Sequence, residues 1–266
     1  MKIGVCVTDY QKWPIVGAGG YDYIEGHLGH IAAASDEEYA EIVKAAKESG
    51  IPVETTNCFF PKGFALYAFD PVTGEGTDEF ADVLKNVAEY ADKAFSRVVP
   101  LGLKVAVLGS GGNRKLLPGI KPEVAEAQFI EVLKVVGDVA DKYGIKIAIE
   151  PLSDCNFIVT LAEGMKFVKA ANHPAVGILN DFFHSAANGE DITTSLKDAA
   201  DMLYHMHIAC PESRKLPTID DKDIIFELCD ELKKTGYDAR ISLEGKSELP
   251  FEEMIRTSYE VMKLVR

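Results

Sequence analysis

The chain has 266 residues, close to the roughly 250 of a closed barrel of eight parallel strands, so we expect one domain over residues 1–266. It carries 28 Lys plus Arg against 42 Asp plus Glu, and this net charge of −14 disfavours nucleic acid and anionic membrane surfaces as partners. The five cysteines lack disulfide or zinc spacing, and the first apolar run is too short for a signal or membrane segment, so we expect a cytoplasmic protein.

Short runs rich in β-branched residues alternate with helical patterns along the chain. We expect strands at residues 3–7, 21–25, 52–56, 104–110, 145–151, 176–181, 203–209 and 240–245. We expect helices at residues 36–49, 78–95, 122–143, 161–171, 221–235 and 251–265. Residues 9–20 are expected to form a short Gly-rich connection, and residues 59–76 a long aromatic loop at a pocket mouth. Eight strands alternating with helices predict an α/β protein, a single (β/α)8 TIM barrel.

Acidic residues or histidines lie at the carboxyl ends of the last four expected strands. Glu150 ends IAIE, Asp181 ends GILND, His207 lies in HMHIA and Glu244 ends ISLE. Each residue alone is explained more simply as a helix cap or a member of an ion pair. Four coincident cases at the end where a barrel builds its active site indicate a functional cluster. A buried carboxylate costs several kcal/mol unless it is paired, and a bound cation would provide that pairing.

Two Glu, one Asp and one His make an oxygen-rich ligand set. Such a set suits one divalent cation, for which we favour Mn²⁺, with Mg²⁺, Co²⁺ or Zn²⁺ as alternatives. His205 and His207 lie two positions apart, so both face the barrel interior at different depths. We choose His207 as the ligand because it is nearer the carboxyl end of its strand, and the reverse assignment stays open.

Other residues near the expected strand ends are candidates for binding a substrate. His184, three residues after Asp181, could donate a hydrogen bond to substrate or could cap the following turn. The segment GSGGNRK at residues 109–115 lacks the signature of a phosphate-binding loop. Its glycines would allow a close approach of substrate, and Arg114 could donate to a hydroxyl or carboxylate, although a plain turn explains the segment too.

Four motifs together are similar to one known family. They are IEPL at residues 149–152, NDFFH at residues 180–184, HMHIA followed by Arg214, and SLEG at residues 242–245. In order and spacing they resemble the xylose isomerase-like superfamily, especially its ketose 3-epimerases and hydroxypyruvate isomerases. The resemblance covers nearly the whole chain.

The resemblance implies roles for individual residues. Glu150, Asp181, His207 and Glu244 would be the metal ligands, and Glu150 and Glu244 would also be the catalytic acid and base. The residues expected to contact substrate are His184, Arg214, Asn57 and Glu25. After Glu150 this chain reads SDCNF, where the epimerases have an Asn-Arg-aromatic-Glu stretch, and this difference leaves the substrate open.

These observations predict a metal-dependent sugar isomerase or epimerase that acts through an enediolate on a small, unphosphorylated carbohydrate. One alternative is a lyase or dehydratase that acts on a sugar derivative, and another is a sugar-binding barrel without catalysis. An endonuclease of the same fold would need more than the six histidines present and a less acidic chain. The resemblance also makes a homodimer or homotetramer a reasonable expectation.

Overall fold

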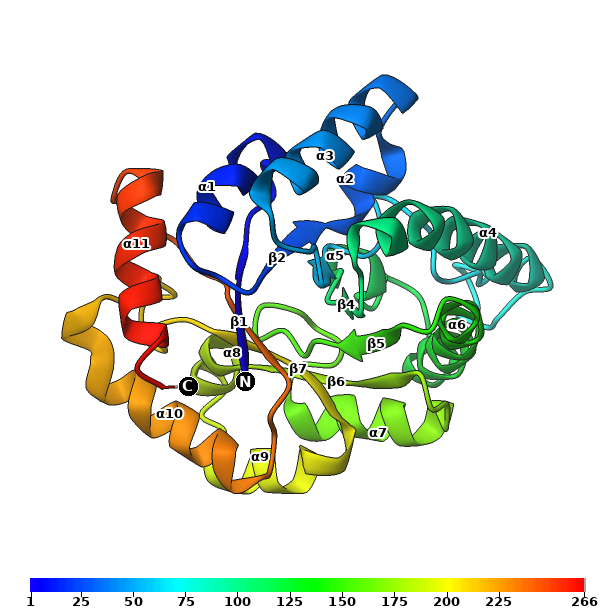
Figure 1. Cartoon of the computed structure of the whole chain (residues 1–266). Coiled ribbons are helices and arrows are strands. Elements are labelled where there is room, and N and C mark those ends of the chain that lie inside the picture. The colour runs from blue at the N-terminus through cyan, green and yellow to red at the C-terminus, as the bar shows by residue number, and fades with distance from the viewer. Residues whose placement is uncertain (266) are drawn as a thin grey trace.

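The computed structural model describes residues 1–265, and the eight strands within them close into a barrel (Figure 1). Every strand is parallel to its neighbours, and β1 pairs with β8 to close the ring. The strands are β1 Lys2–Cys6, β2 Tyr23–His27, β3 Thr55–Asn57, β4 Val105–Leu108, β5 Lys146–Ile149, β6 Val176–Asp181, β7 Leu203–Ile208 and β8 Arg240–Leu243. The expected (β/α)8 barrel is therefore confirmed, with strand bounds that differ from the expected ones by a few residues.

The helices surround the strands, as Figure 1 shows. They are α1 Trp13–Ala18, α2 Leu28–Ala33, α3 Asp36–Ser49, α4 Phe80–Val98, α5 Gly111–Arg114, α6 Pro122–Lys142, α7 Leu161–Ala171, α8 Phe182–Ala187, α9 Ile192–Ala199, α10 Lys222–Lys234 and α11 Phe251–Met262. The short 3-10 helices are η1 Tyr10–Lys12, η2 Val99–Leu101, η3 Ala200–Met202 and η4 Ile219–Asp221. No helix within residues 1–265 has the length and hydrophobicity needed to cross a membrane.

Local sequence explains where the long helices begin and end. The Ser35 side chain accepts a hydrogen bond from the backbone N–H of Glu38 at the start of α3, and Gly50 ends that helix in the left-handed conformation at φ 70°. Thr160 and Glu163 form a capping box at the start of α7. Both helices have the bounds that the sequence predicts.

Besides the short helices α2, α5 and α8, which were not expected, two segments differ from the expectation. Residues 9–20 contain η1 and α1 instead of a plain Gly-rich connection, and α1 buries Trp13 and Val16 in the core. Helix α9, between β6 and β7, was not expected, although the Asp191 side chain caps it by accepting from the backbone N–H of Thr194 at 2.8 Å. Residues 59–76 form the expected loop, without a helix or a named strand.

The core has two apolar parts, and the smaller one consists of Val105, Val107, Ala148 and Leu179. A large apolar cluster fills the space between the strands and the helices, and β4, β5 and β6 are buried on both faces except for Lys146. At the amino end of the barrel, the buried Glu54 carboxylate bonds to Lys2 and Arg240. The carboxyl ends of the strands, by contrast, hold the buried histidines and acids described next.

Candidate metal centre and active site

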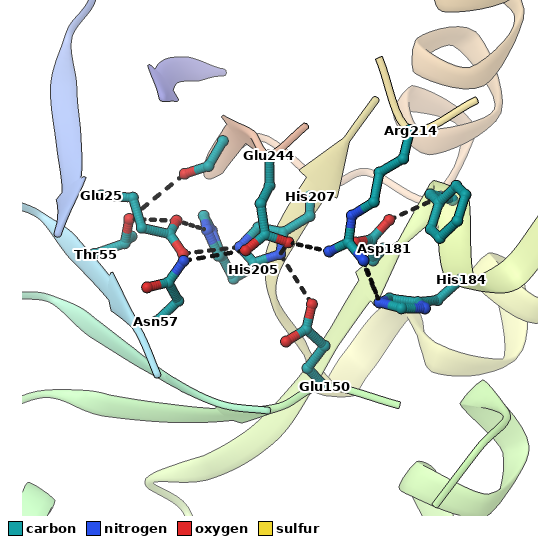
Figure 2. Close-up of polar contacts among 12 residues, drawn as sticks. Glu25, Thr55, Asn57, Glu150, Asp181, His184, His205, His207, Arg214 and Glu244 are labelled. Carbon is teal, nitrogen blue, oxygen red and sulfur yellow. Dashed lines mark hydrogen bonds and ion pairs between the residues drawn. The ribbon is translucent and has the colours of Figure 1, made fainter. Parts of the chain in front are cut away.

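Four side chains from four consecutive strands meet at the carboxyl end of the barrel (Figure 2). Glu150 directly follows β5, Asp181 ends β6, His207 is the last residue but one of β7, and Glu244 directly follows β8. One ligand atom from each lies within 4.8 Å of the others. Because the strands are parallel, their carboxyl ends bring these residues together from positions up to 94 apart in the sequence.

His207 is the centre of this cluster. Its Nδ1 atom lies 3.1 Å from Oε1 of Glu150 and 3.2 Å from Oε2 of Glu244. Burial lowers the pKa of His207, but the surrounding carboxylates outweigh burial and raise it well above its usual value. His205 lies on the same strand but outside the cluster, with Nε2 2.8 Å from Oε2 of Glu25.

Asp181 has one oxygen that faces the cluster without a hydrogen bond. Its Oδ1 accepts from the backbone N–H of Phe183 at 2.7 Å and so caps α8. Its Oδ2 is buried and has no hydrogen-bond partner within residues 1–265. A buried carboxylate oxygen is costly in that state, whereas a divalent cation would use it as a ligand. Three carboxylates, one of which has this unbonded oxygen, and one imidazole therefore fit a divalent cation.

The two glutamates have different electrostatic surroundings. Burial, followed by repulsion from Glu244, raises the pKa of Glu150 to about 7. Burial also raises the pKa of Glu244, but His207 and Arg214 outweigh it and lower the value to about 2. Glu244 is therefore a stable anion, whereas Glu150 can exchange a proton near neutral pH.

Asn57 and Arg214 hold the Glu244 carboxylate from two sides. Asn57 Nδ2 donates to Oε1 of Glu244 at 3.0 Å, and Arg214 Nη2 donates to Oε2 at 2.8 Å. Arg214 also lies over the Phe183 ring at 5.0 Å and approaches Asp181 Oδ2 at 3.6 Å. Both residues line cavities, so the structure brings them to the site where the sequence analysis expects substrate contacts.

His184 is held by a residue that sequence reasoning missed. The backbone N–H of Ser153 donates to Nδ1 of His184 at 3.1 Å, and the Ser153 hydroxyl lies 2.8 Å from the same atom. An Nδ1 atom that accepts leaves the ring proton on Nε2 in the neutral imidazole. That Nε2 lies 3.2 Å from Nη1 of Arg214, beside the cluster. Ser153 lies in the SDCNF segment, where this chain departs from the epimerases. This departure is the feature of the sequence that could have pointed to the residue.

Arg114 and Glu25 lie elsewhere than the sequence suggested. Arg114 is buried, and its guanidinium donates to backbone carbonyls of Gly109, Glu150, Phe157 and Ile158. These bonds use the donors that a substrate would need, so Arg114 braces the loops after β4 and β5 instead. Glu25 is 0% exposed and faces the barrel interior beneath His207, which departs from the expected contact with substrate.

A cavity of about 580 Å³ opens beside the cluster. It is lined by Glu150 and Glu244, by Asn57, and by the loops at residues 60–63 and 109–113. Gly109 leaves room for the Glu150 carboxylate in its present position, because a Cβ atom at residue 109 would lie 2.4 Å from Oε2 of Glu150. The residues 60–63 belong to the long loop that the sequence analysis places at a pocket mouth.

The family assignment follows from comparison with known proteins. The sequence model of the xylose isomerase-like TIM barrel family matches residues 16–265. The chain belongs to this family. The match covers nearly the whole barrel, in agreement with the resemblance of the four motifs.

Similar proteins within the family are epimerases. A 3-dehydro-D-guloside 4-epimerase of Escherichia coli K12 is 26% identical over 208 residues, which cover 77% of this chain and 76% of that protein. A D-psicose 3-epimerase of Agrobacterium fabrum is 28% identical over 205 residues, which cover 74% of this chain and 66% of that protein. The crystal structure of a D-psicose 3-epimerase in the presence of D-fructose has a TM-score of 0.81 at 20% identity and covers 100% of this chain and 98% of its own. The sequence similarities support an isomerase or epimerase enzyme, and the structural similarity shows the shared fold.

Proposed function

We propose that this chain is a metal-dependent sugar epimerase or isomerase, in which Glu150 and Glu244 move a proton at a carbon next to a carbonyl group. The observation that carries the proposal is the placement of these two carboxylates at nearly equal distances from Nδ1 of His207, beside one cavity. Two carboxylates with separated pKa values are the usual arrangement for paired acid and base work.

Glu150, Asp181, His207 and Glu244 would hold the cation, for which we favour Mn²⁺ because oxygen ligands dominate the set. When bound, a divalent cation acts as a Lewis acid on substrate oxygens and makes the neighbouring C–H bond more acidic. The remaining chemistry belongs to side chains of the protein.

Each side chain has a task that its contacts support. Glu244 is an anion held by Asn57 and Arg214, so its orientation is fixed for accepting a proton. Glu150 is assigned the return of the proton to the reacting carbon, and in the metal-free site burial and repulsion from Glu244 raise its pKa to about 7. His184 presents Nε2 beside Arg214, and together they offer donors to the hydroxyl and carbonyl oxygens of a sugar.

The test is a pair of substitutions, Glu150→Gln and Glu244→Gln, with turnover measured on a panel of ketoses and aldoses in the presence of Mn²⁺. We expect each to lower kcat by about 10² to 10⁴-fold, the usual contribution of a general acid or base. In D₂O, the wild-type enzyme should place deuterium at the reacting carbon. The control Glu54→Gln removes a buried carboxylate at the opposite end of the barrel and should retain turnover per folded molecule. If Glu150→Gln and Glu244→Gln both kept a kcat close to that of the wild-type enzyme, the proposal would be refuted.

A substrate that carries a substituent is a second candidate within this proposal. A further cavity of about 470 Å³ shares Gly111, Gly112, Lys115 and Leu152 with the cavity beside the cluster, so the space continues beyond the residues that would hold the reacting carbons. The similarity to a protein named for a guloside supports the same idea. A higher kcat/KM for keto-glycosides than for free ketoses would favour it.

The two alternatives from the sequence analysis have distinct outcomes. A lyase or dehydratase would release a second product or a shortened sugar, which product chromatography would show. A sugar-binding barrel without catalysis would show no turnover and no stoichiometric metal after Mn²⁺ addition.

A further inference from the structure

Glu25 crosses the barrel interior and contacts two histidines of one strand. It lies on β2, while His205 and His207 lie on β7, three strands away around the ring. Its Oε1 lies 2.9 Å from Nε2 of His207, and its Oε2 lies 2.8 Å from Nε2 of His205 (Figure 2). All three side chains are 0% exposed, so water does not substitute for these contacts.

A third donor fixes the position of the Glu25 carboxylate. The Thr55 hydroxyl, on the neighbouring strand β3, donates to Oε2 of Glu25 at 2.7 Å. The Cys6 thiol also faces this carboxylate, and a carboxylate has enough lone pairs to accept from all four groups. The orientation of Glu25 is thus set from both β3 and β7.

The contact with Glu25 decides which nitrogen of His207 carries a proton. When Nε2 donates to the carboxylate, the ring proton of the neutral imidazole is on Nε2, and the lone pair is on Nδ1. Nδ1 is the atom that faces Glu150 and Glu244 in the cluster. A metal binds the lone pair of an imidazole, and a carboxylate behind the other nitrogen strengthens that binding.

We propose that Glu25 is a positioning residue, which holds His207 in the tautomer and orientation that presents Nδ1 to the cation, while His205 and Thr55 keep the Glu25 carboxylate in place. This inference rests on the proposed metal site. It differs from a purely structural role, in which Glu25 satisfies buried polar groups and its loss lowers stability without changing metal affinity.

The first test is the Mn²⁺ affinity of the Glu25→Gln variant, measured by isothermal titration calorimetry. A glutamine has one amide oxygen and one NH₂ group, so it cannot accept from both histidines as the carboxylate does. We expect Mn²⁺ to bind about 10- to 100-fold more weakly, the typical cost of losing such a contact.

The matched control is Tyr23→Phe. Tyr23 lies two residues before Glu25 on β2, is equally buried, and donates to or accepts from the Ser242 hydroxyl at 2.9 Å. The substitution removes a buried polar group from the same strand without touching either histidine contact, so Mn²⁺ affinity should stay within about twofold of the wild type. Equal affinities for Glu25→Gln and the wild type would overturn the inference.

The second test uses the wild-type protein and does not depend on how well a variant folds. Long-range ¹H–¹⁵N correlation spectra of the Zn²⁺-loaded protein report which nitrogen of His207 bears the proton. We expect a proton on Nε2 and coordination at Nδ1, and a proton on Nδ1 would overturn the inference. If the wild type binds no cation at all, the proposed metal site fails and this inference falls with it. If instead the wild type and the Glu25→Gln variant bind Mn²⁺ equally tightly, the metal site stands and only the role of Glu25 is refuted.

Discussion

Metal binding should release protons, and the affinity should therefore rise steeply with pH. His207 has a pKa raised well above its usual value of 6.5 by the carboxylates around it, and Glu150 has a pKa of about 7 because of burial and Glu244. A cation binds the unprotonated imidazole and the ionised carboxylate, so both protons must leave when it binds. Lowering the pH favours the protonated, metal-free site and weakens binding.

The size of the effect follows from these two groups. Displacing the His207 proton makes the Mn²⁺ affinity fall as the pH is lowered below its raised pKa, by up to about tenfold per pH unit. Glu150, whose pKa lies inside this interval, adds about another tenfold. From pH 8 to pH 6 the Mn²⁺ affinity should therefore fall by more than the roughly tenfold that Glu150 alone contributes.

Isothermal titration calorimetry in buffers of different ionisation enthalpy measures both the affinity and the number of protons released. The number of protons released on binding should rise as the pH falls from 8 to 6, because Glu150 becomes protonated in the metal-free site over this interval. The control Glu150→Gln removes one titrating group, so its affinity, though weaker, should depend less steeply on pH. An affinity that is flat between pH 6 and pH 8, or binding without proton release, would refute this reasoning.

Two further predictions follow from single contacts. Gly109→Ala places a Cβ atom 2.4 Å from Oε2 of Glu150, so it should displace that carboxylate and weaken Mn²⁺ binding at least tenfold, whereas Gly112→Ala, where a Cβ meets nothing within 4 Å, should leave Mn²⁺ affinity unchanged. Equal Mn²⁺ affinities of the Gly109→Ala and Gly112→Ala variants would contradict this prediction. Ser153→Ala removes the hydroxyl 2.8 Å from Nδ1 of His184 and should raise KM about fivefold, the cost of one hydrogen bond, at constant Mn²⁺ affinity. An unchanged KM would show that the Ser153 hydroxyl does not position His184.

Sequence reasoning found the barrel and the cluster because both follow from short-range patterns. Each of Glu150, Asp181, His207 and Glu244 ends or follows an apolar strand, and parallel strands bring such ends together without any knowledge of packing. Even the choice of His207 as the cluster residue needed only the direction of the strand. The same reasoning places the long helices, whose apolar periodicity and caps are local features.

The roles of Glu25 and Arg114 could not be predicted in that way. Whether a polar side chain near a strand end points to the mouth or to the barrel interior depends on what lies across the barrel. Glu25 finds its partners 180 and 182 residues further along the chain. Arg114 is bound by carbonyls of loops that have no helical or strand pattern. Short helices such as α1 and α9 were missed because one or two turns give too little periodicity.

The segment after Glu150 is fastened to a neighbouring loop and not to the cluster of Glu150, Asp181, His207 and Glu244. Asn156 is tied to the loop after α5, since its side chain accepts from the backbone N–H of Leu116 at 3.0 Å and donates to the Leu116 carbonyl at 3.1 Å. Arg114 holds the carbonyls that follow Asn156. These contacts fasten the segment to the β4 side of the mouth, where it lines the outer cavity beside Gly111. Because Glu150 itself is fixed by β5, we infer that changes in this segment alter the space for a substituent without moving the ligands.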